Sequence, residues 1–123
     1  MSRGGFKSLL VWQKAQDLAV AIYRASQEGP LSRDYCLRDQ MRRAAVSAAS
    51  NIAEGDERDT DRDAVRFLFI AKGSVAELRS QLDLAVRIGS LDADTGSTLE
   101  THAEEVAKML RGLIKARTTP PPL

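Results

Sequence analysis

Four stretches of this sequence place apolar residues three and four positions apart, the spacing of one face of an α-helix. The stretches are separated by Gly29-Pro30, Gly55 and Gly89, and glycine and proline end helices readily. The four apolar stripes are Trp12–Ile22, Leu37–Ile52, Phe67–Ala85 and Leu99–Leu113. Because the connections are short, neighbouring helices should run antiparallel. The sequence therefore predicts an all-α fold, an antiparallel up-down four-helix bundle.

Polar residues that cap helix N-termini predict where the helices begin. The expected starts are Ser8, a position near Ser32, Thr60 and a position around Asp92. Thr60 to Asp63 reads as a capping box in which Asp63 reaches back, and 56–59 reads as a charged loop. We expect residues 1–7 to be a flexible N-terminus, 8–117 to form one four-helix bundle domain, and 118–123 to be a disordered, proline-rich tail.

Charge and cysteine content argue against several classes of protein. The 123 residues include 18 basic and 17 acidic side chains, a net charge of +1, so bulk charge attracts neither nucleic acid nor a membrane. Cys36 is the one cysteine, which excludes an internal disulfide and a thiolate metal site and suits the cytoplasm. No apolar run approaches the roughly 20 residues that span a bilayer. We expect a cytoplasmic protein with no membrane partner.

The sequence offers no catalytic constellation. His102 is the one histidine, and the Glu-x-x-His pairs of a di-iron bundle are missing. A nucleophilic pair of Cys36 with His102 is conceivable in space, but nothing in the local sequence supports it. We expect no catalytic residue, no metal, no cofactor and no enzymatic activity.

The second predicted helix carries a polar stripe beside its apolar face. Its members fall within an arc of about 80° and are Gln40, Arg43, Ser47, Asn51 and Glu54. One interpretation is a solvated flank. The other is a structural polar seam, buried or half-buried, that pairs across the bundle. On the second interpretation, Arg43 should meet Glu77 of the third helix in a buried ion pair.

Two surface features point to partners. On the third helix, Phe69, Ile70 and Val86 lie off the core stripe, which indicates either an interface between copies of the chain or ordinary scattered surface hydrophobes. On the fourth helix, Lys108, Arg111 and Lys115 share one face, with Arg117 just beyond. These bases either bind nucleic-acid phosphates or only complement the helix C-terminus.

Several motifs resemble one bacterial family. The most specific is the second-helix run Gln40–Ser47 followed by Asn51–Gly55. Other matching segments are Phe6–Ala15, Phe67–Leu82, Gly89–Leu91 and Met109–Leu113. Together they resemble the four-helix-bundle proteins first noted as encoded in 23S rRNA intervening sequences, over roughly Phe6 to Ile114. The chain departs from the pattern at Gly29-Pro30 and Asp34, where relatives often carry Phe-Pro and then Glu.

The resemblance implies a bundle that assembles as a ring-like homopentamer. A similar branch, the accessory variability proteins of diversity-generating retroelements, binds nucleic acid and a reverse transcriptase through a basic pentamer, a role that a net charge of +1 does not suit. We therefore expect a non-enzymatic homo-oligomeric scaffold or binding module that contacts RNA or an RNA-bound protein partner. The alternatives are a binder of a small molecule or peptide in a cavity of the oligomer, and an uncharacterised enzyme.

Overall fold

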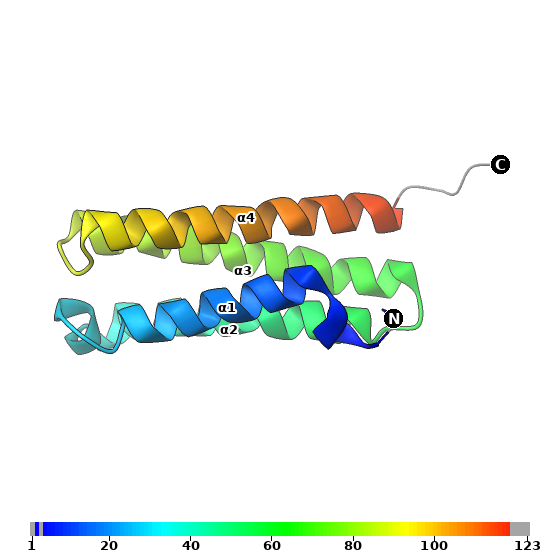
Figure 1. Cartoon of the computed structure of the whole chain (residues 1–123), viewed down its shortest axis with the longest axis horizontal. Helices are drawn as coiled ribbons and strands as arrows, with labels where there is room; N and C mark the ends of the chain where they lie inside the picture. The colour runs from blue at the N-terminus through cyan, green and yellow to red at the C-terminus, as the bar shows by residue number, and fades with distance from the viewer. Residues whose placement is uncertain (1, 3, 119–123) are drawn as a thin grey trace.

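Four long helices packed side by side make up the protein (Figure 1). The computed structural model describes residue 2 and residues 4–118. Its elements are η1 (Phe6–Ser8), α1 (Leu10–Ala25), η2 (Pro30–Arg33), α2 (Tyr35–Asp56), α3 (Asp61–Arg87) and α4 (Ala93–Thr118), where η denotes a short 3-10 helix. The α1–α2 and α3–α4 turns lie at one end of the molecule and the α2–α3 turn at the other (Figure 1). The prediction of an all-α, antiparallel up-down four-helix bundle is confirmed.

The core forms along the predicted apolar stripes, with small side chains on one helix and large ones on the others. The face of α2 that points inward is rich in alanine, with Ala44, Ala45, Ala48 and Ala49 all buried. The largest fully buried side chains include Leu18, Ile22, Met41, Ile52, Leu68, Leu78, Leu82 and Leu110. Full burial of each such side chain contributes about 1.5–3 kcal/mol. Small residues on α2 let α3 approach it closely, and the bulky residues fill the remaining space.

Two of the predicted helix starts are confirmed by their hydrogen bonds. The Thr60 hydroxyl accepts from the backbone N–H of Asp63 at 3.2 Å, although no reciprocal bond from the Asp63 side chain is seen within the part of the chain that the structure describes. The Asp92 carboxylate accepts from the backbone N–H of Thr95 at 2.8 Å and from its hydroxyl at 2.7 Å. These two bonds lower the pKa of the Asp92 carboxyl.

The other two predicted starts are wrong by one to three residues. Asp34, not Ser32, caps α2 by accepting from the backbone N–H of Leu37 at 3.1 Å. The Ser8 hydroxyl donates to the carbonyl of Gly5 within η1, and α1 begins after Leu9 with no side-chain cap. In both places a short 3-10 helix precedes the α-helix, and the candidate serine is used inside that shorter helix instead.

The first helix ends earlier than its glycine suggests. We expected α1 to run to Gly29, but it ends at Ala25. Ser26 is fully buried at this point, and its hydroxyl donates to the Tyr23 carbonyl and accepts from Arg42 Nε of α2 at 2.8 Å. The chain then turns through η2, which places Leu31 in the core.

The two ends of the chain also differ from the expectation. The N-terminal segment was expected to be flexible, but its described residues contact the bundle: the Phe6 ring lies edge-on to Trp12 with centroids 5.1 Å apart, and Ser2 binds Asp56. Thr118 is the last residue of α4 and not the start of the tail. The rest of the predicted disordered tail, 119–123, lies outside the described residues.

Two glycines shape the end of the bundle where α3 turns into α4. Gly89 takes a positive φ of 79°, the left-handed conformation that terminates α3. In the first turns of α4, Gly96 is buried, and a Cβ added there would overlap Cγ2 of Val86 on α3. The two helices therefore touch closely at Gly96.

We expect Gly96→Ala to lower the free energy of unfolding by about 1–3 kcal/mol, because overpacking forces Val86 to move. The matched control is Gly112→Ala on the same helix, where nothing lies within 4 Å of the added Cβ. That change should raise stability by up to about 1 kcal/mol through helix propensity alone. Urea unfolding of both variants, and of Gly96→Ala in a Val86→Ala background, measures the difference. Equal effects at the two glycines would contradict the close contact.

Candidate functional site

The centre of the predicted polar seam joins α2 to α3. Ser47 Oγ lies 2.9 Å from Ser74 Oγ, and Ser74 is buried. The Asn51 side-chain amide donates to the Ser47 carbonyl at 2.9 Å and to Ser47 Oγ at 3.1 Å. Small hydroxyls fit between two closely packed helices and satisfy each other there, so these three residues form a structural contact.

The longer members of the seam face solvent. Gln40, Arg43, Glu54 and Glu77 are exposed. Glu54 pairs with Arg58 on its own helix at 2.9 Å. Because α2 and α3 are antiparallel and Ser47 lies beside Ser74, Arg43 and Glu77 stand at about the same level of the bundle. No ion pair joins them among the described residues, so the predicted buried Arg43–Glu77 pair is wrong. The two helices pack too closely to enclose a guanidinium group.

A buried carboxylate that the sequence did not single out links both ends of the chain. Asp56 was expected in a charged loop, but it is the last residue of α2 and is 1% exposed. The backbone N–H of Ser2 donates to both of its oxygens at 3.0 Å, and the Ser2 hydroxyl donates to Oδ1. Arg117 Nη2 of α4 lies 3.2 Å from Oδ1. Asp56 follows Ile52 by one helical turn, and this spacing was the one signal that placed it on the core side.

The electrostatics of Asp56 follow from these contacts. Burial by itself raises the pKa of a carboxyl, since it disfavours the charged form. The hydrogen bonds from the Ser2 hydroxyl and backbone N–H, together with Arg117, outweigh burial and bring the pKa of Asp56 below its ordinary value. The carboxylate is therefore charged at neutral pH and stabilises the folded state.

Large apolar side chains are exposed along the outer side of α3. Ile70, Leu84 and Ile88 are each about half exposed, and their spacing places them on one side of the helix. Phe69, beside this stripe, is 52% exposed. Phe69 and Ile70 thus remain interface candidates, while Leu84 and Ile88 were missed although their helical spacing from Ile70 could have identified them.

Val86, the third interface candidate, lies elsewhere. It is half-buried in the groove between α3 and α4, against Gly96. It therefore does not share the exposed face of Phe69 and Ile70, and we correct that assignment.

A second exposed apolar surface lies between α1 and α2. Val20, Tyr23 and Val46 are 40–43% exposed and line a groove of about 440 Å³. Arg24 is the one charged residue among its described lining residues, and Ala19 is the buried one. No pattern within a single helix indicates this groove, because its walls come from two helices.

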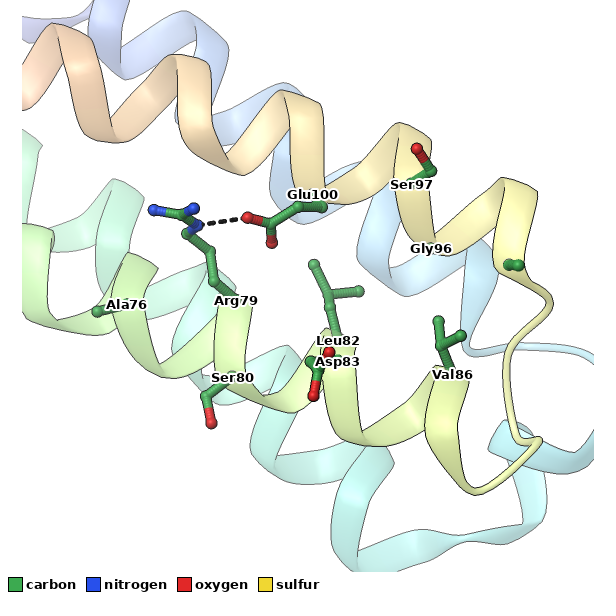
Figure 2. A pocket seen from close by; sticks show the side chains of 10 residues that line it. Ala76, Arg79, Ser80, Leu82, Asp83, Val86, Gly96, Ser97 and Glu100 are labelled. Carbon is green, nitrogen blue, oxygen red and sulfur yellow. Dashed lines mark hydrogen bonds and ion pairs between the residues drawn. The ribbon is translucent and has the colours of Figure 1, made fainter.

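Another hollow, of about 640 Å³, lies between α3 and α4 (Figure 2). Arg79 Nε and Glu100 Oε1 approach to 2.6 Å across it, and Figure 2 shows this pair bridging the two helices. Ser80, Asp83 and Ser97 also line the hollow and are exposed. Binding sites for small molecules commonly hold a few converging polar groups within an enclosed cavity. This hollow is an open surface depression with its polar groups in solvent.

The described residues bring no catalytic groups together. Cys36 is exposed at the start of α2, His102 is half-buried on α4, and no interaction joins the two within residues 4–118. No three His, Cys, Asp or Glu side chains gather as a metal site would require in the described part of the chain. Over the same residues, none of the helices has both the length and the apolar character needed to cross a bilayer.

The predicted basic stripe is present in part. Lys108, Arg111 and Lys115 are exposed on α4, and their spacing places them on one face. Arg117 is different: its side chain is only 16% exposed and binds Asp56. Arg117 therefore stabilises the fold and is not available to a phosphate group.

Proteins of known sequence and structure resemble this chain over most of its length. The sequence model of the family described as 23S rRNA-intervening sequence protein matches residues 7–112. Among solved structures, a crystal structure of a protein of unknown function from the S23 ribosomal protein family of Bacteroides thetaiotaomicron VPI-5482 is similar, with a TM-score of 0.79 and 23% identity, covering 86% of this chain and 99% of that chain. At this identity, the likeness shows the shared fold. No curated protein matches the sequence.

We expect Arg117→Ala to lower the free energy of unfolding by about 3 kcal/mol at neutral pH, because it removes a partner from a buried charge. This is the lower end of the usual range, since Ser2 still donates to Asp56. Arg111→Ala, an exposed change on the same helix, is the control and should stay within about 0.5 kcal/mol of the parent. Chemical denaturation measures both variants, and equal stabilities would contradict the proposed contact.

The same carboxylate predicts a pH dependence. Because the folded pKa of Asp56 lies below the unfolded value of about 3.9, its contribution is present above that pH and is lost as the pH falls through the folded pKa. The stability difference between the parent and Asp56→Asn should therefore be largest at neutral pH and shrink below about pH 4. A difference that stays constant from pH 7 to pH 3 would show that Asp56 is not held by these bonds.

Proposed function

Because the chain belongs to the 23S rRNA-intervening sequence protein family, we propose that it is a non-enzymatic scaffold that assembles from several copies of itself. One observation carries this proposal: large apolar side chains are exposed on two sides of the bundle, at Ile70, Leu84 and Ile88 on α3 and at Val20, Tyr23 and Val46 between α1 and α2. Large apolar side chains that are exposed together on one side of a bundle are typical of surfaces that another protein covers.

Assembly into a closed oligomer accounts for both surfaces. Covering apolar area contributes about 25 cal/mol per Å², and association in turn costs several kcal/mol in lost freedom of motion. A subunit contact that covers both surfaces removes more apolar area from water than a contact that covers one surface. It therefore offsets the cost of association better. The bundle supplies the rigid support, and its partners bind the faces that remain exposed.

We expect the purified protein to form a closed oligomer, and the number that we propose from the family resemblance is five chains. Light scattering coupled to gel filtration at micromolar concentration measures the mass directly. A mass near five times that of the chain supports the ring of five. A dimer or tetramer would refute the count, and a monomer over the whole accessible concentration range would overturn the scaffold proposal.

RNA is the second candidate partner, and the exposed stripe of Lys108, Arg111 and Lys115 favours it. In an oligomer this stripe repeats once per subunit, and several weak sites on one assembly act together. No aromatic side chain stands between these basic residues to stack on a nucleobase. Binding should therefore not depend on the RNA sequence. For each phosphate that a basic side chain neutralises, the plot of log affinity against log salt concentration becomes steeper by a little less than one unit.

Gel-shift titration of single-stranded RNA at two salt concentrations tests this second proposal. Binding should be strongest at low salt, and the Lys108→Ala/Arg111→Ala/Lys115→Ala variant should weaken it about tenfold or more. The control, Lys7→Ala/Arg33→Ala/Arg62→Ala, removes the same charge from separate exposed positions and should have a smaller effect. No shift of the parent at low salt, or equal losses in the two triple variants, would exclude this stripe as the RNA site.

A further inference from the structure

The two exposed apolar surfaces differ in shape. The first, which we call the α3 ridge, is the convex stripe of Ile70, Glu77, Leu84 and Ile88. Ile70, Glu77 and Leu84 recur every seven residues, so they lie on one side of α3 about 10 Å apart. The second, which we call the α1–α2 groove, is the hollow of about 440 Å³ whose apolar walls are Val20, Tyr23 and Val46. Gln16, Gln27 and Ser50 also line the groove. One chain therefore presents both a ridge and a groove in which apolar side chains lie beside polar ones.

We propose that the α3 ridge of one copy docks into the α1–α2 groove of the next copy, so that the subunit interface is heterologous. This inference rests on the proposed self-assembly and specifies how it is built. In a heterologous contact two different surfaces of the same chain meet, whereas in a two-fold contact one surface meets itself.

Shape supports the docking of ridge into groove. Branched side chains on the α3 ridge project from a helix, and the groove offers a floor at the buried Ala19 between the side chains of Val20, Tyr23 and Val46. Packing the side chains of one helix between those of two others is the ordinary way in which helices associate. A ridge facing another ridge would leave the apolar side chains of the groove uncovered.

Charge supports the same arrangement. Glu77, midway between Ile70 and Leu84 on the ridge, is exposed, and Arg24 is exposed in the groove. Neither side chain forms an ion pair within the described part of the chain, and their charges are opposite. A two-fold contact of ridge against ridge would bring two Glu77 carboxylates together, and like charges placed side by side oppose association. The heterologous contact instead brings Glu77 toward Arg24.

The placement of the two surfaces also favours a ring. The groove lies between α1 and α2, and the ridge lies on the side of α3 next to the Ser47–Ser74 contact with α2. The surfaces therefore occupy adjacent sides of the bundle and not opposite ones. A contact between adjacent sides turns each following subunit relative to the last, and a heterologous contact forms a ring where this rotation closes.

Complementation between two blocked variants tests this inference. Ile70→Glu blocks the ridge and Val46→Glu blocks the groove, and both positions are half exposed, so the bundle itself should fold normally. Each variant alone should be a monomer by light scattering. An equimolar mixture should form a one-to-one dimer, because the intact groove of the first variant accepts the intact ridge of the second. Leu10→Glu, which is 57% exposed on α1, is the control and should keep the parent's mass.

The outcomes separate this inference from the proposed function. If the parent is a monomer, the self-assembly proposal fails and this inference fails with it. If the parent is an oligomer but the mixture of variants remains monomeric, or if Val46→Glu alone keeps the parent's mass, the scaffold proposal stands and the ridge-in-groove contact is wrong. Circular dichroism of each variant, compared with the parent, checks that its helices are intact.

Discussion

The close approach of α2 to α3 is the contact on which the rest of the structure depends. It is possible because the facing residues are small: a Cβ added at Gly55 would lie 3.0 Å from Phe67 Cβ and 3.1 Å from the Ala64 carbonyl oxygen. At this separation the space between the helices holds alanine side chains and the hydroxyls of Ser47 and Ser74. Larger polar side chains do not fit, so Arg43 and Glu77 point outward. The exposure of Arg43 on α2 and of Glu77 on α3 is thus a consequence of the close packing between these two helices.

The end of the bundle at the α2–α3 turn is held by a different interaction. Asp56 brings together Ser2 from the N-terminal segment, the last turn of α2 and Arg117 from α4. A buried charge is tolerated only where its hydrogen bonds are satisfied, and here the N-terminal segment and α4 supply the donors. Arg117 is thereby removed from the basic face of α4, on which Lys108, Arg111 and Lys115 are exposed. The electrostatic surface of the protein therefore depends on how its chain ends pack.

The interior of the bundle is a packed core of apolar side chains. The described residues gather no catalytic groups, and the structural relative from Bacteroides thetaiotaomicron VPI-5482 is itself of unknown function. The exterior carries a ridge on α3 and a groove between α1 and α2. Both expose apolar side chains, and they bear opposite charges at Glu77 and Arg24. A bundle held rigid by the α2–α3 contact presents these surfaces in fixed directions. Fixed directions are what a symmetric assembly requires.

The sequence by itself determined the helices and their caps at Thr60 and Asp92, because helical periodicity and capping act over a few residues. It also determined the apolar stripe of each helix, since the predicted stripes form the core. Tertiary structure decided what covers each face: Asp56 became buried, Arg43 and Glu77 stayed exposed, and Val86 packed on Gly96. It decided as well that Val20, Tyr23 and Val46 form one groove, since two helices supply them. The physical reason is the distance between helices. It depends on side chains far apart in sequence, and no pattern within a single helix encodes it.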